Sequence, residues 1–405
     1  MALKLWQDGV DNASVATIPE NGNFKCVGSS YLVKKDPFAY SENKLILKDG
    51  FAVDLYDGVA WRQITNRAAI EFDPAENLDT GDTLSHGKDY YVYITLTGTT
   101  IAIVVSLNST YPDGFNANNS RKIGGFHVGH IRKVSDDGLW VPIDSAGNKF
   151  GSSGTKWQDN VATGIVPNSV WDLRNRPRVI TPGMVKINEN LWEGIYIPSV
   201  DEAITFMAGT NGLSVAEGKL KIAYGELPAT GTEGLNQFNF NELAARQGLR
   251  LLSYDEWMQG AFGSPQGEDG SNNYGWTKTT NTARCRTGCQ VDPSTGEFDN
   301  VNGVKPYAIS AKNVVDCAGN VSEWTKTFSL DFSSTNWNWQ NVLGANQGQA
   351  YLPNSDGLRA LHCGNNWNNG VHCGPRTVNG NNYPWNVNTN IGARLACDLA
   401  KRKTI

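Results

Sequence analysis

Residues 316–324 read Asp-Cys-Ala-Gly-Asn-Val-Ser-Glu-Trp, and they lie at the centre of a set of four blocks. Leu-Arg-Leu-Leu-Ser-Tyr-Asp-Glu-Trp-Met precedes them at 249–258, while Gly-Asn-Asn-Trp follows at 364–367 and Ile-Gly-Ala-Arg-Leu at 391–395. Tryptophan beside charged residues is typical of a core that buried polar pairs hold together. We expect three tryptophans as core residues and two charged residues as buried polar links. They are Trp257, Trp324, Trp367, Arg250 and Glu323.

The order and spacing of the four blocks resemble the superfamily of formylglycine-generating enzymes and C-type-lectin-like proteins. Its pattern runs R-L-P-T-E-x-E-W, then G-N-V-W-E-W, then G-G-S-W, then G-F-R. The resemblance extends from residue 249 to residue 395. It implies an α+β C-type-lectin-like domain, which we place at residues 166–405.

A closer resemblance covers most of the chain and is to the major tropism determinant family of phage receptor-binding proteins. The blocks that carry it are Asp89-Tyr90, Arg-Lys-Ile-Gly-Gly-Phe-His at 121–127, Ser-Val-Trp-Asp-Leu at 169–173, Arg176-Pro177, and Gly392-Ala393-Arg394 followed by Cys397-Asp398. The resemblance implies a multidomain chain whose N-terminal region is β-rich. We expect a β-prism-like assembly region at 1–50, a β-sandwich-like domain and linker at 51–165, and three chains that intertwine.

The sequence before residue 165 shows no helical period and reads as β-structure. Residues 45–47 and 51–55 flank Asp49-Gly50 and are predicted to form a hairpin. Residues 90–94 and 101–105 flank a Gly-Thr-Thr turn and are predicted to form a second. Residues 148–165 read as a linker.

Three short helices are predicted after residue 165, each from an N-capping pattern. Ser199-Val200-Asp201-Glu202 is a capping box that predicts a helix running to Gly209. Asn239 is predicted to cap a second helix that ends at Gly248, and Ser253 is predicted to cap a third. The rest of the domain predicts loops and short strands.

The composition excludes several classes of protein. The chain has 405 residues, with 35 Lys and Arg against 40 Asp and Glu, and a formal charge of −5. This mild acidity offers no basic surface for nucleic acid. The apolar runs are far too short to insert into a membrane, and no signal peptide is evident. With 40% hydrophobic residues, wholesale disorder is not expected.

The segment 364–391 is rich in asparagine and nearly free of charge. It contains ten Asn, no acidic residue and no Lys, and its one fixed cation is Arg376. Asn is poorly suited to helices and strand interiors, so this density predicts exposed loops and turns. Amide-rich loops beside Trp367, Tyr383 and Trp385 have the composition of a binding surface that combines adaptable hydrogen bonds with rigid rings. A low-complexity surface loop is the alternative.

The major tropism determinant family offers a genetic account of these asparagines. Its members diversify through a retroelement that mutates adenines, and Asn codons carry adenine at their first two positions. Aligning Trp367, Arg376 and Gly392-Ala393-Arg394 with the family scaffold requires no gap. The family's variable, ligand-binding positions then fall on Asn366, Asn368, Asn369, Gly370, His372, Asn379, Asn381, Asn382, Asn386, Asn388, Asn390 and Ile391. Nine of the twelve are Asn, as a lightly mutated copy of the template would encode.

The same resemblance implies a scaffold that holds the variable loops. The expected scaffold residues are Trp367, Arg376, Tyr383, Trp385 and Arg394. Asn386, Asn388 and Asn390 alternate along a stretch that we expect to be extended, so their side chains should share one face. Because single amide contacts are weak, trimerisation would matter: avidity can add a factor of about 10²–10⁴.

An oxidase is the enzymatic alternative. Formylglycine-generating enzymes place two reactive Cys shortly after the G-G-S-[YW] block, where this chain has Asn369 and Gly374. Copper-dependent redox chemistry would require Cys363 and Cys373 to act as a metal-binding pair instead. We therefore expect no enzyme activity and no catalytic residue. The seven Cys are read as buried free thiols, and a bridge between Cys363 and Cys373 is left open.

No cofactor is expected, and a structural metal ion is left open. His127 and His130 form an H-x-x-H pair that we expect to be structural. Calcium-dependent lectins use acidic and amide ligands, yet no Asp or Glu lies between residues 357 and 397. Calcium-bridged sugar binding is therefore not expected here. Glu268 and Asp269 are expected to be a solvated pair.

The sequence thus predicts a non-catalytic receptor-binding protein of a phage or prophage, located at the tail tip of the virion. Its expected partners are a bacterial cell-surface receptor (protein or glycan), two further copies of itself, and other tail-fibre components. The alternative is a diversified surface or secreted protein of bacteria with the same lectin-like domain, located at the bacterial cell surface.

Overall fold

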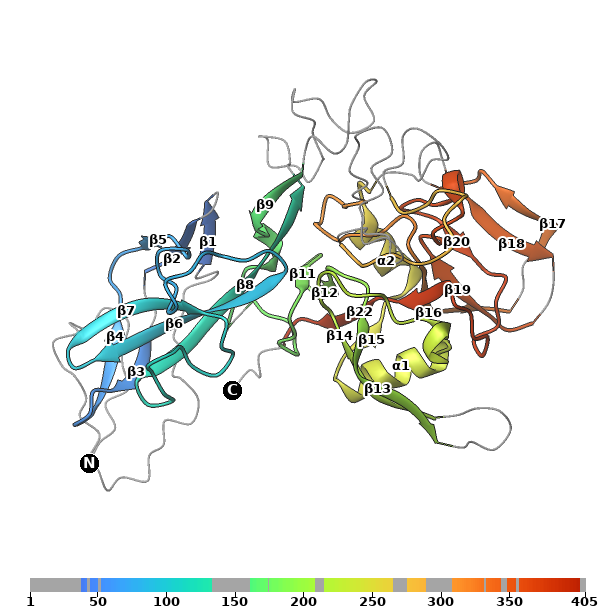
Figure 1. Ribbon diagram of the computed structural model, residues 1–405. Coiled ribbons are helices and arrows are strands. Elements are labelled where there is room, and N and C mark those ends of the chain that lie inside the picture. The colour runs from blue at the N-terminus through green and yellow to red at the C-terminus, as the bar shows by residue number, and fades with distance from the viewer. Residues whose placement is uncertain are drawn as a thin grey trace, which may run out of the picture. The chain divides into compact units, whose positions relative to one another are not determined.

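The computed structural model describes residues 38–41, 44–49, 52–132, 161–173, 175–207, 215–264, 275–288, 308–330, 333–343, 348–354 and 357–400. Within these residues the chain is mostly β-strand with two short α-helices (Figure 1). It divides into two compact units. The first comprises Met1–Val128, Ser169–Arg176 and Arg402–Ile405, and the second Gly129–Asn168 and Pro177–Lys401. The predicted multidomain, β-rich character is confirmed.

The first unit is built from antiparallel strands. β1 (Phe38–Ser41), β2 (Lys44–Leu47) and β5 (Ile70–Phe72) form one sheet in that order. β3 (Ala52–Tyr56) pairs with β4 (Trp61–Thr65). β6 (Lys88–Thr97) lies between β7 (Thr100–Ser106) and β8 (Ser120–Arg132), and β10 (Trp171–Asp172) pairs with β8.

One of the two predicted hairpins is confirmed and the other is wrong. β6 and β7 form the predicted pair, joined through Gly98 at φ +57°, a conformation that glycine adopts without strain. Residues 45–47 and 52–55 do form strands, but β2 pairs with β1 and β5 while β3 pairs with β4. The Asp-Gly pair favours a local hairpin, but the pairing with other strands overrides it because that pairing buries Leu45, Leu47 and Leu55 completely.

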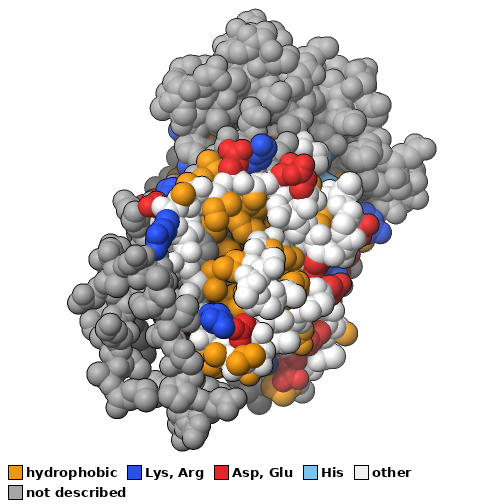
Figure 2. All heavy atoms as spheres, turned by 90° about the vertical axis from the view of Figure 1, so that its left-hand side faces the viewer, with side chains coloured by type: hydrophobic (Ala, Val, Ile, Leu, Met, Phe, Trp, Pro, Cys, Tyr) orange, Lys and Arg blue, Asp and Glu red, His pale blue; other side chains and the backbone are white. Residues whose placement is uncertain are grey.

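The first unit also exposes apolar side chains. Figure 2 views the side on which β4 and β7 lie in Figure 1, and it shows hydrophobic side chains gathered into a patch with charged residues at its border. Among the described residues of this unit, the exposed large apolar side chains are Val59, Ile70, Ile101, Leu107 and Tyr111. A surface of this kind is typical of proteins that associate with a partner.

The second unit contains both α-helices and three sheets among its described residues. β11 (Met184–Lys186), β12 (Leu191–Gly194), β22 (Leu395–Asp398) and β15 (Arg250–Leu251) form a sheet in that order, and β13 (Ser199–Met207) pairs with β14 (Val215–Lys221). The third sheet has the order β17 (Ser333–Gln340), β18 (Ala350–Asn354), β20 (Val378–Asn379), β19 (Arg359–Cys363), β16 (Ser322–Ser329), β21 (Ile391–Ala393). The helices are α1 (Gln237–Arg246) and α2 (Tyr254–Ala261). Neither helix has the length and apolar character that crossing a membrane requires.

Two of the three predicted helices are confirmed. α2 begins after Ser253, whose hydroxyl oxygen accepts the backbone N–H of Glu256, while the Glu256 carboxylate accepts the backbone N–H of Ser253. α1 ends just before Gly248, as predicted. Its N-cap, however, is Asn236, which forms a reciprocal box with Asn239, so the helix starts three residues earlier than predicted.

The helix predicted from Ser199 is wrong. Residues 199–207 form β13, which pairs with β14 through two irregularities in register. The S-x-x-E spacing fits a capping box, but Val200, Ile204 and Thr205 are β-branched and favour a strand once a partner is available. The pairing with β14 therefore overrides the local capping signal.

Several predictions fall wholly or partly outside the described residues. The predicted linker at 148–165 is described only at β9 (Val161–Ile165), where the chain forms a strand. Glu268, Asp269, Cys26 and Cys289 also lie outside the described residues.

The sequence blocks quoted at the start meet in the core of the second unit. Arg394 is fully buried and donates to both oxygens of the Glu323 carboxylate, at 2.6 and 2.8 Å. The indole N–H of Trp257 donates to the same carboxylate at 2.8 Å. Trp324 is also buried, and Trp367 packs with a buried apolar cluster. The predicted roles of these tryptophans and of Glu323 are confirmed.

Arg250 is a polar link, as predicted, but it is half-buried rather than buried. Its guanidinium is half-buried and pairs with Glu256 at 2.8 Å and with the exposed Asp398 at 2.8 Å. The pair links the start of α2 to β22 at the edge of the core, where water can reach the carboxylate of Asp398. Arg250 therefore joins two elements near the surface, and the arginine that is buried in the core is Arg394.

Candidate ligand-binding site

The asparagine-rich segment joins two strands of the third sheet. It leaves β19 at Cys363 and enters β21 at Ile391, and β20 is the only strand between them. Between β19 and β20 the chain turns through Gly364 and Asn365, both at positive φ, and then forms the 3₁₀ turn Gly370–His372. Because β19 and β21 are held on either side of β16, the loops are presented at the ends of fixed strands.

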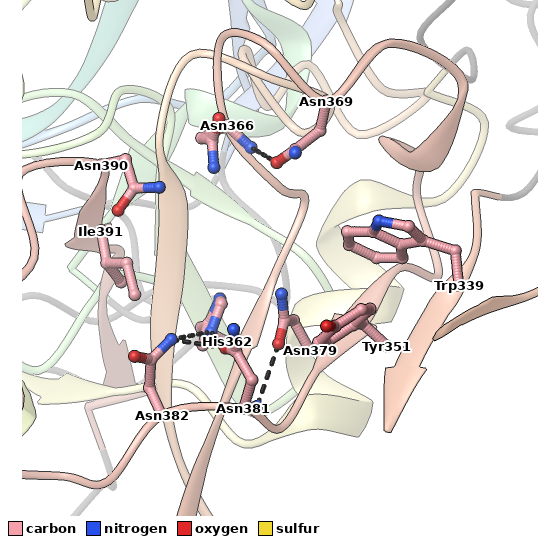
Figure 3. Close-up of a pocket in the computed structure, with 10 residues that line it drawn as sticks. All are labelled: Trp339, Tyr351, His362, Asn366, Asn369, Asn379, Asn381, Asn382, Asn390 and Ile391. Carbon is pink, nitrogen blue, oxygen red and sulfur yellow. Dashed lines mark hydrogen bonds between the residues drawn. The ribbon is translucent and has the colours of Figure 1, made fainter. Parts of the chain in front are cut away.

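These loops enclose a pocket with a volume of about 230 Å³ (Figure 3). It is lined by Trp339, Tyr351, His362, Asn366, Asn369, Asn379, Asn381, Asn382, Asn390 and Ile391. Seven of these ten are predicted ligand-binding positions, and they come from parts of the segment up to 25 residues apart. The lining contains no Asp, Glu, Lys or Arg.

Three asparagines at the pocket are oriented by backbone groups. Asn369 Oδ1 accepts the backbone N–H of Asn366 at 3.2 Å, and the other two, Asn366 and Asn379, face the middle of the pocket. Asn366 Oδ1 accepts the backbone N–H of Asn368 at 3.2 Å, and Asn379 Oδ1 accepts the backbone N–H of Asn381 at 3.0 Å. A backbone N–H only donates, so the atom facing it must be the amide oxygen. The side-chain NH₂ groups of Asn366 and Asn379 therefore point the other way, and Figure 3 shows both directed towards the middle of the pocket.

His362 and the neighbouring amides form the floor. His362 Nε2 lies 3.2 Å from Asn381 Oδ1 and 3.0 Å from Asn382 Nδ2, while Asn388 donates to Asn382 Oδ1 at 2.7 Å. Burial lowers the pKa of His362 to about 4, so the imidazole is neutral at physiological pH. Its Nε2 donates to Asn381 in one tautomer and accepts from Asn382 in the other.

The other five predicted ligand-binding positions lie around the pocket without lining it. Asn368 is exposed, and Gly370 is buried in its 3₁₀ turn. His372 stacks on Trp339, with ring centroids 4.5 Å apart, and so fixes one wall of the pocket. Asn386 and Asn388 are half-buried and make hydrogen bonds within the loops.

The stretch 386–390, predicted to be extended, forms no strand, and its residues 389–390 form a turn. Asn386 Oδ1 accepts the backbone N–H of Tyr383 at 2.7 Å. Exposure does alternate, but the amides are the half-buried side chains, and the more exposed ones are Trp385 at 47% and Val387 at 49%. Amides bonded to their own loop explain this arrangement, because Asn side chains close turns readily.

The expected scaffold residues have different degrees of burial. Trp367 and Arg394 lie in the core, and Tyr383 is sandwiched between the Arg359 guanidinium, 4.0 Å from its ring centroid, and the parallel ring of Trp385. Arg376 is exposed, and its backbone carbonyl accepts the hydroxyl of Tyr254 at 2.6 Å. The Arg376 guanidinium donates to the Leu343 carbonyl at 3.4 Å, so both its main chain and its side chain contribute to loop position.

Three pocket residues were missed at the level of sequence. Trp339 and Tyr351 come from β17 and β18, and His362 comes from β19. The alternating run Asn336-Trp337-Asn338-Trp339 has the same amide-and-aromatic composition as the segment 364–391. This likeness could have identified Trp339 as a candidate site residue. Nothing in the sequence around His362 distinguishes it, since its role depends on the neighbouring strand β20.

The cysteines of the described residues are buried free thiols, as predicted. They are Cys285, Cys317, Cys363, Cys373 and Cys397. The bridge that we left open between Cys363 and Cys373 is not formed. Burial raises the pKa of both thiols, which disfavours the thiolate that a copper site or a nucleophile needs. His127 Nδ1 donates to the Asp89 carboxylate oxygen Oδ2 at 3.0 Å, which is a structural role.

Comparison with known proteins gives two matching families. The family described as Mtd second domain matches residues 38–158, and the Sulfatase-modifying factor enzyme 1-like domain matches residues 203–399. A tail fiber receptor-binding protein of Bordetella phage BPP-1 is 26% identical over 346 residues, which are 82% of this chain and 76% of the phage protein.

Two solved structures have the same fold. The Major Tropism Determinant M1 variant has a TM-score of 0.63 at 21% identity, over 93% of this chain and 88% of its own. The I1 variant has a TM-score of 0.61 at 21% identity, over 92% and 87%. The resemblances read from the sequence, to the major tropism determinants and to the formylglycine-generating-enzyme domain, are therefore confirmed.

Proposed function

We propose that the chain is a phage receptor-binding protein that attaches the virion to a bacterial host through the pocket and its surrounding loops. The observation that carries the proposal is the meeting of seven predicted variable positions at one pocket. Distant parts of a low-complexity loop have no reason to converge on a shared cavity. The similarity to a phage tail fiber receptor-binding protein over most of the chain supports the same role.

The proposal extends to assembly and location. Residues 1–50 form a β-prism-like region, residues 51–165 a β-sandwich-like domain with a linker, and three chains associate as a homotrimer at the tail tip, in contact with other tail-fibre components. The exposed apolar side chains of the first unit support an association of this kind. Neither nucleic acid nor membrane insertion has a part in the function.

We also propose that a retroelement diversifies the twelve positions and that the chain catalyses nothing. The buried, protonated state of Cys363 and Cys373 argues against oxidase chemistry. The positions proposed to vary include side chains that mainly shape the loops, such as His372 and Asn388, so substitutions there would alter the shape of the pocket as well as its lining.

Binding of the labelled full-length chain to bacteria tests the proposal. Flow cytometry on strains that the carrying phage infects should give saturable binding, and the unlabelled chain should reduce phage adsorption. The variant Asn379→Lys/Asn390→Lys places two long charged side chains in the pocket and should abolish binding. The control Asn338→Lys adds a charge at an exposed position of β17 and should bind normally. A folded chain that binds none of these strains would contradict the proposal.

A further inference from the structure

The pocket presents hydrogen-bond donors that no described residue uses. The NH₂ groups of Asn366 and Asn379 point into it, because their oxygens are held by backbone N–H groups. Both side chains are more than nine-tenths buried, each with 7% exposure. The carboxamide of Asn390 makes no hydrogen bond within the described residues, and Figure 3 shows its nitrogen directed to the same space. Three donors thus converge from strand β20 and from the loops before and after it.

These donors face an open pocket, where water can reach them but no acceptor among the described residues does. A ligand that offers oxygen acceptors in the same geometry would exchange this hydration for direct hydrogen bonds from groups that are already oriented. The pocket contains no cationic side chain among its lining residues, and burial keeps His362 neutral. An anionic ligand would therefore lose its hydration without gaining a counter-charge. The acceptors must belong to a neutral ligand.

The volume of the pocket and its aromatic wall restrict the kinds of ligand that fit. A volume of about 230 Å³ is smaller than the ~300–1,000 Å³ of pockets for drug-sized ligands, and suits a single ring. Trp339 is held in place by His372 on one side and by Tyr351, whose ring centroid is 4.8 Å away. The part of the indole that lines the pocket offers an apolar contact for C–H groups next to donors for oxygens.

We propose that the pocket binds one neutral sugar residue of a bacterial surface glycan, with an N-acetylhexosamine as the best match. Its hydroxyl, ring and acetamide oxygens would accept from Asn366, Asn379 and Asn390, while its methyl and ring C–H groups lie against Trp339. No calcium is required, because the amides contact the sugar directly. The inference rests on the proposed function and specifies the chemical class of the receptor.

Saturation-transfer NMR with free N-acetylglucosamine and N-acetylgalactosamine tests the sugar directly. The full-length chain should show transfer to the acetamide methyl at millimolar sugar, unchanged by EDTA. Asn379→Asp keeps the oxygen that accepts the Asn381 N–H but replaces the donor with a carboxylate oxygen, so binding should fall at least tenfold. Asn390→Asp should reduce binding to a similar extent, although the Asn390 side chain makes no hydrogen bond to the described residues that the change could break. Asn338→Asp makes the same chemical change at an exposed position and should retain binding.

The unfolding temperature of each variant separates lost binding from lost folding. If the Asp variants fold and bind both sugars as the parent does, the donors do not recognise the sugar and the proposal fails. Absence of any transfer from neutral sugars in the folded parent, on monosaccharides and on purified host polysaccharide, overturns it equally.

Treated cells distinguish failure of the sugar proposal from failure of the attachment function. Periodate oxidises vicinal diols of glycans, and proteinase removes exposed proteins. Cell binding that periodate abolishes and proteinase spares supports the glycan. Binding that proteinase abolishes and periodate spares leaves attachment intact and contradicts the glycan. Absence of binding to untreated host cells would instead remove the attachment function itself.

Discussion

Glu193 is the residue whose environment is least expected from its chemistry. It is fully buried, its carboxylate oxygens make no hydrogen bond with described residues, and its nearest cation is Arg394 at 3.5 Å. Arg394 is already engaged by Glu323 at 2.6 and 2.8 Å, so one guanidinium faces two carboxyl groups. Burial raises the pKa of Glu193 well above its ordinary value of 4.5, and Arg394 offsets this only in part. We infer that Glu193 is protonated in the folded chain and that Glu323 carries the charge.

Replacing Glu193 tests this assignment. Above pH 4.5 the unfolded chain loses the proton that the folded chain keeps, so this group makes the parent less stable as pH rises, by up to about 1.4 kcal/mol per pH unit. Glu193→Gln removes that dependence. We expect its unfolding free energy relative to the parent to increase between pH 5 and pH 8, as followed by denaturant titration.

Glu323→Gln is the matched comparison, because it removes the charge that pairs with Arg394. Breaking a buried pair of this kind costs about 3–5 kcal/mol, and the loss should exceed that of Glu193→Gln at every pH. If Glu193→Gln is instead the more destabilised variant at pH 8, then Glu193 is the ionised partner and the assignment is reversed.

At the scale of elements, one turn controls where an asparagine-rich loop lies. Gly231 begins a 3₁₀ turn capped by Thr230, and its backbone N–H donates to the Asn388 carbonyl at 3.0 Å. A Cβ at Gly231 would come within 2.5 Å of the Asn388 carbonyl carbon and oxygen. The absence of a side chain at Gly231 therefore lets the loop approach the rest of the domain.

Gly231→Ala should displace the loop that carries Asn388 and Asn390. Overpacking of this kind costs about 1–3 kcal/mol, and we expect the loop to move rather than the core. Binding to host cells should fall by about tenfold, while the unfolding temperature falls by only a few degrees and the chain stays folded. Thr232→Ala, an exposed change in the same turn, is the control. Unchanged binding by Gly231→Ala would mean that the position of this loop does not matter for attachment.

How far the sequence predicts an element depends on where the decisive contacts lie. The capping box at Ser253 and Glu256 is satisfied within one turn of chain, so α2 was predictable. The identical S-x-x-E spacing at Ser199 failed, because pairing of β13 with β14 decides that segment. The candidate site follows the same rule: the asparagines could be read from the segment itself, whereas His362 and Trp339 enter from separate strands. Strand order within a sheet is not written in any local pattern.

At the scale of the whole molecule, attachment through neutral amide contacts requires more than one copy. A single neutral sugar site binds weakly, and linked sites gain about 10²–10⁴ in avidity. The account therefore depends on association of the chains. Light scattering on the purified chain should give a mass of three times 44.2 kDa.

Charged substitutions on the exposed apolar surface of the first unit should lower the mass of the assembly in solution and leave the pocket of the second unit intact. Ile101→Asp and Val59→Asp place charges at two of the exposed apolar positions of the first unit and are expected to favour the monomer. Such monomers should retain the sugar signal in NMR but lose most binding to cells. A parent chain that is monomeric at micromolar concentration and still binds cells tightly would remove the avidity argument.

The central claim is that the loops around this pocket form a diversified attachment surface. Deep sequencing of the gene segment for residues 364–394 across a phage or prophage population, with its flanking DNA, tests this claim most directly. We predict substitutions confined to adenine-derived changes at the twelve named positions, with Trp367, Arg376 and Arg394 constant and an invariant near-copy of the segment nearby. Asn codons as static as their neighbours, with no near-copy, would contradict it and leave a lectin-like domain with a fixed site.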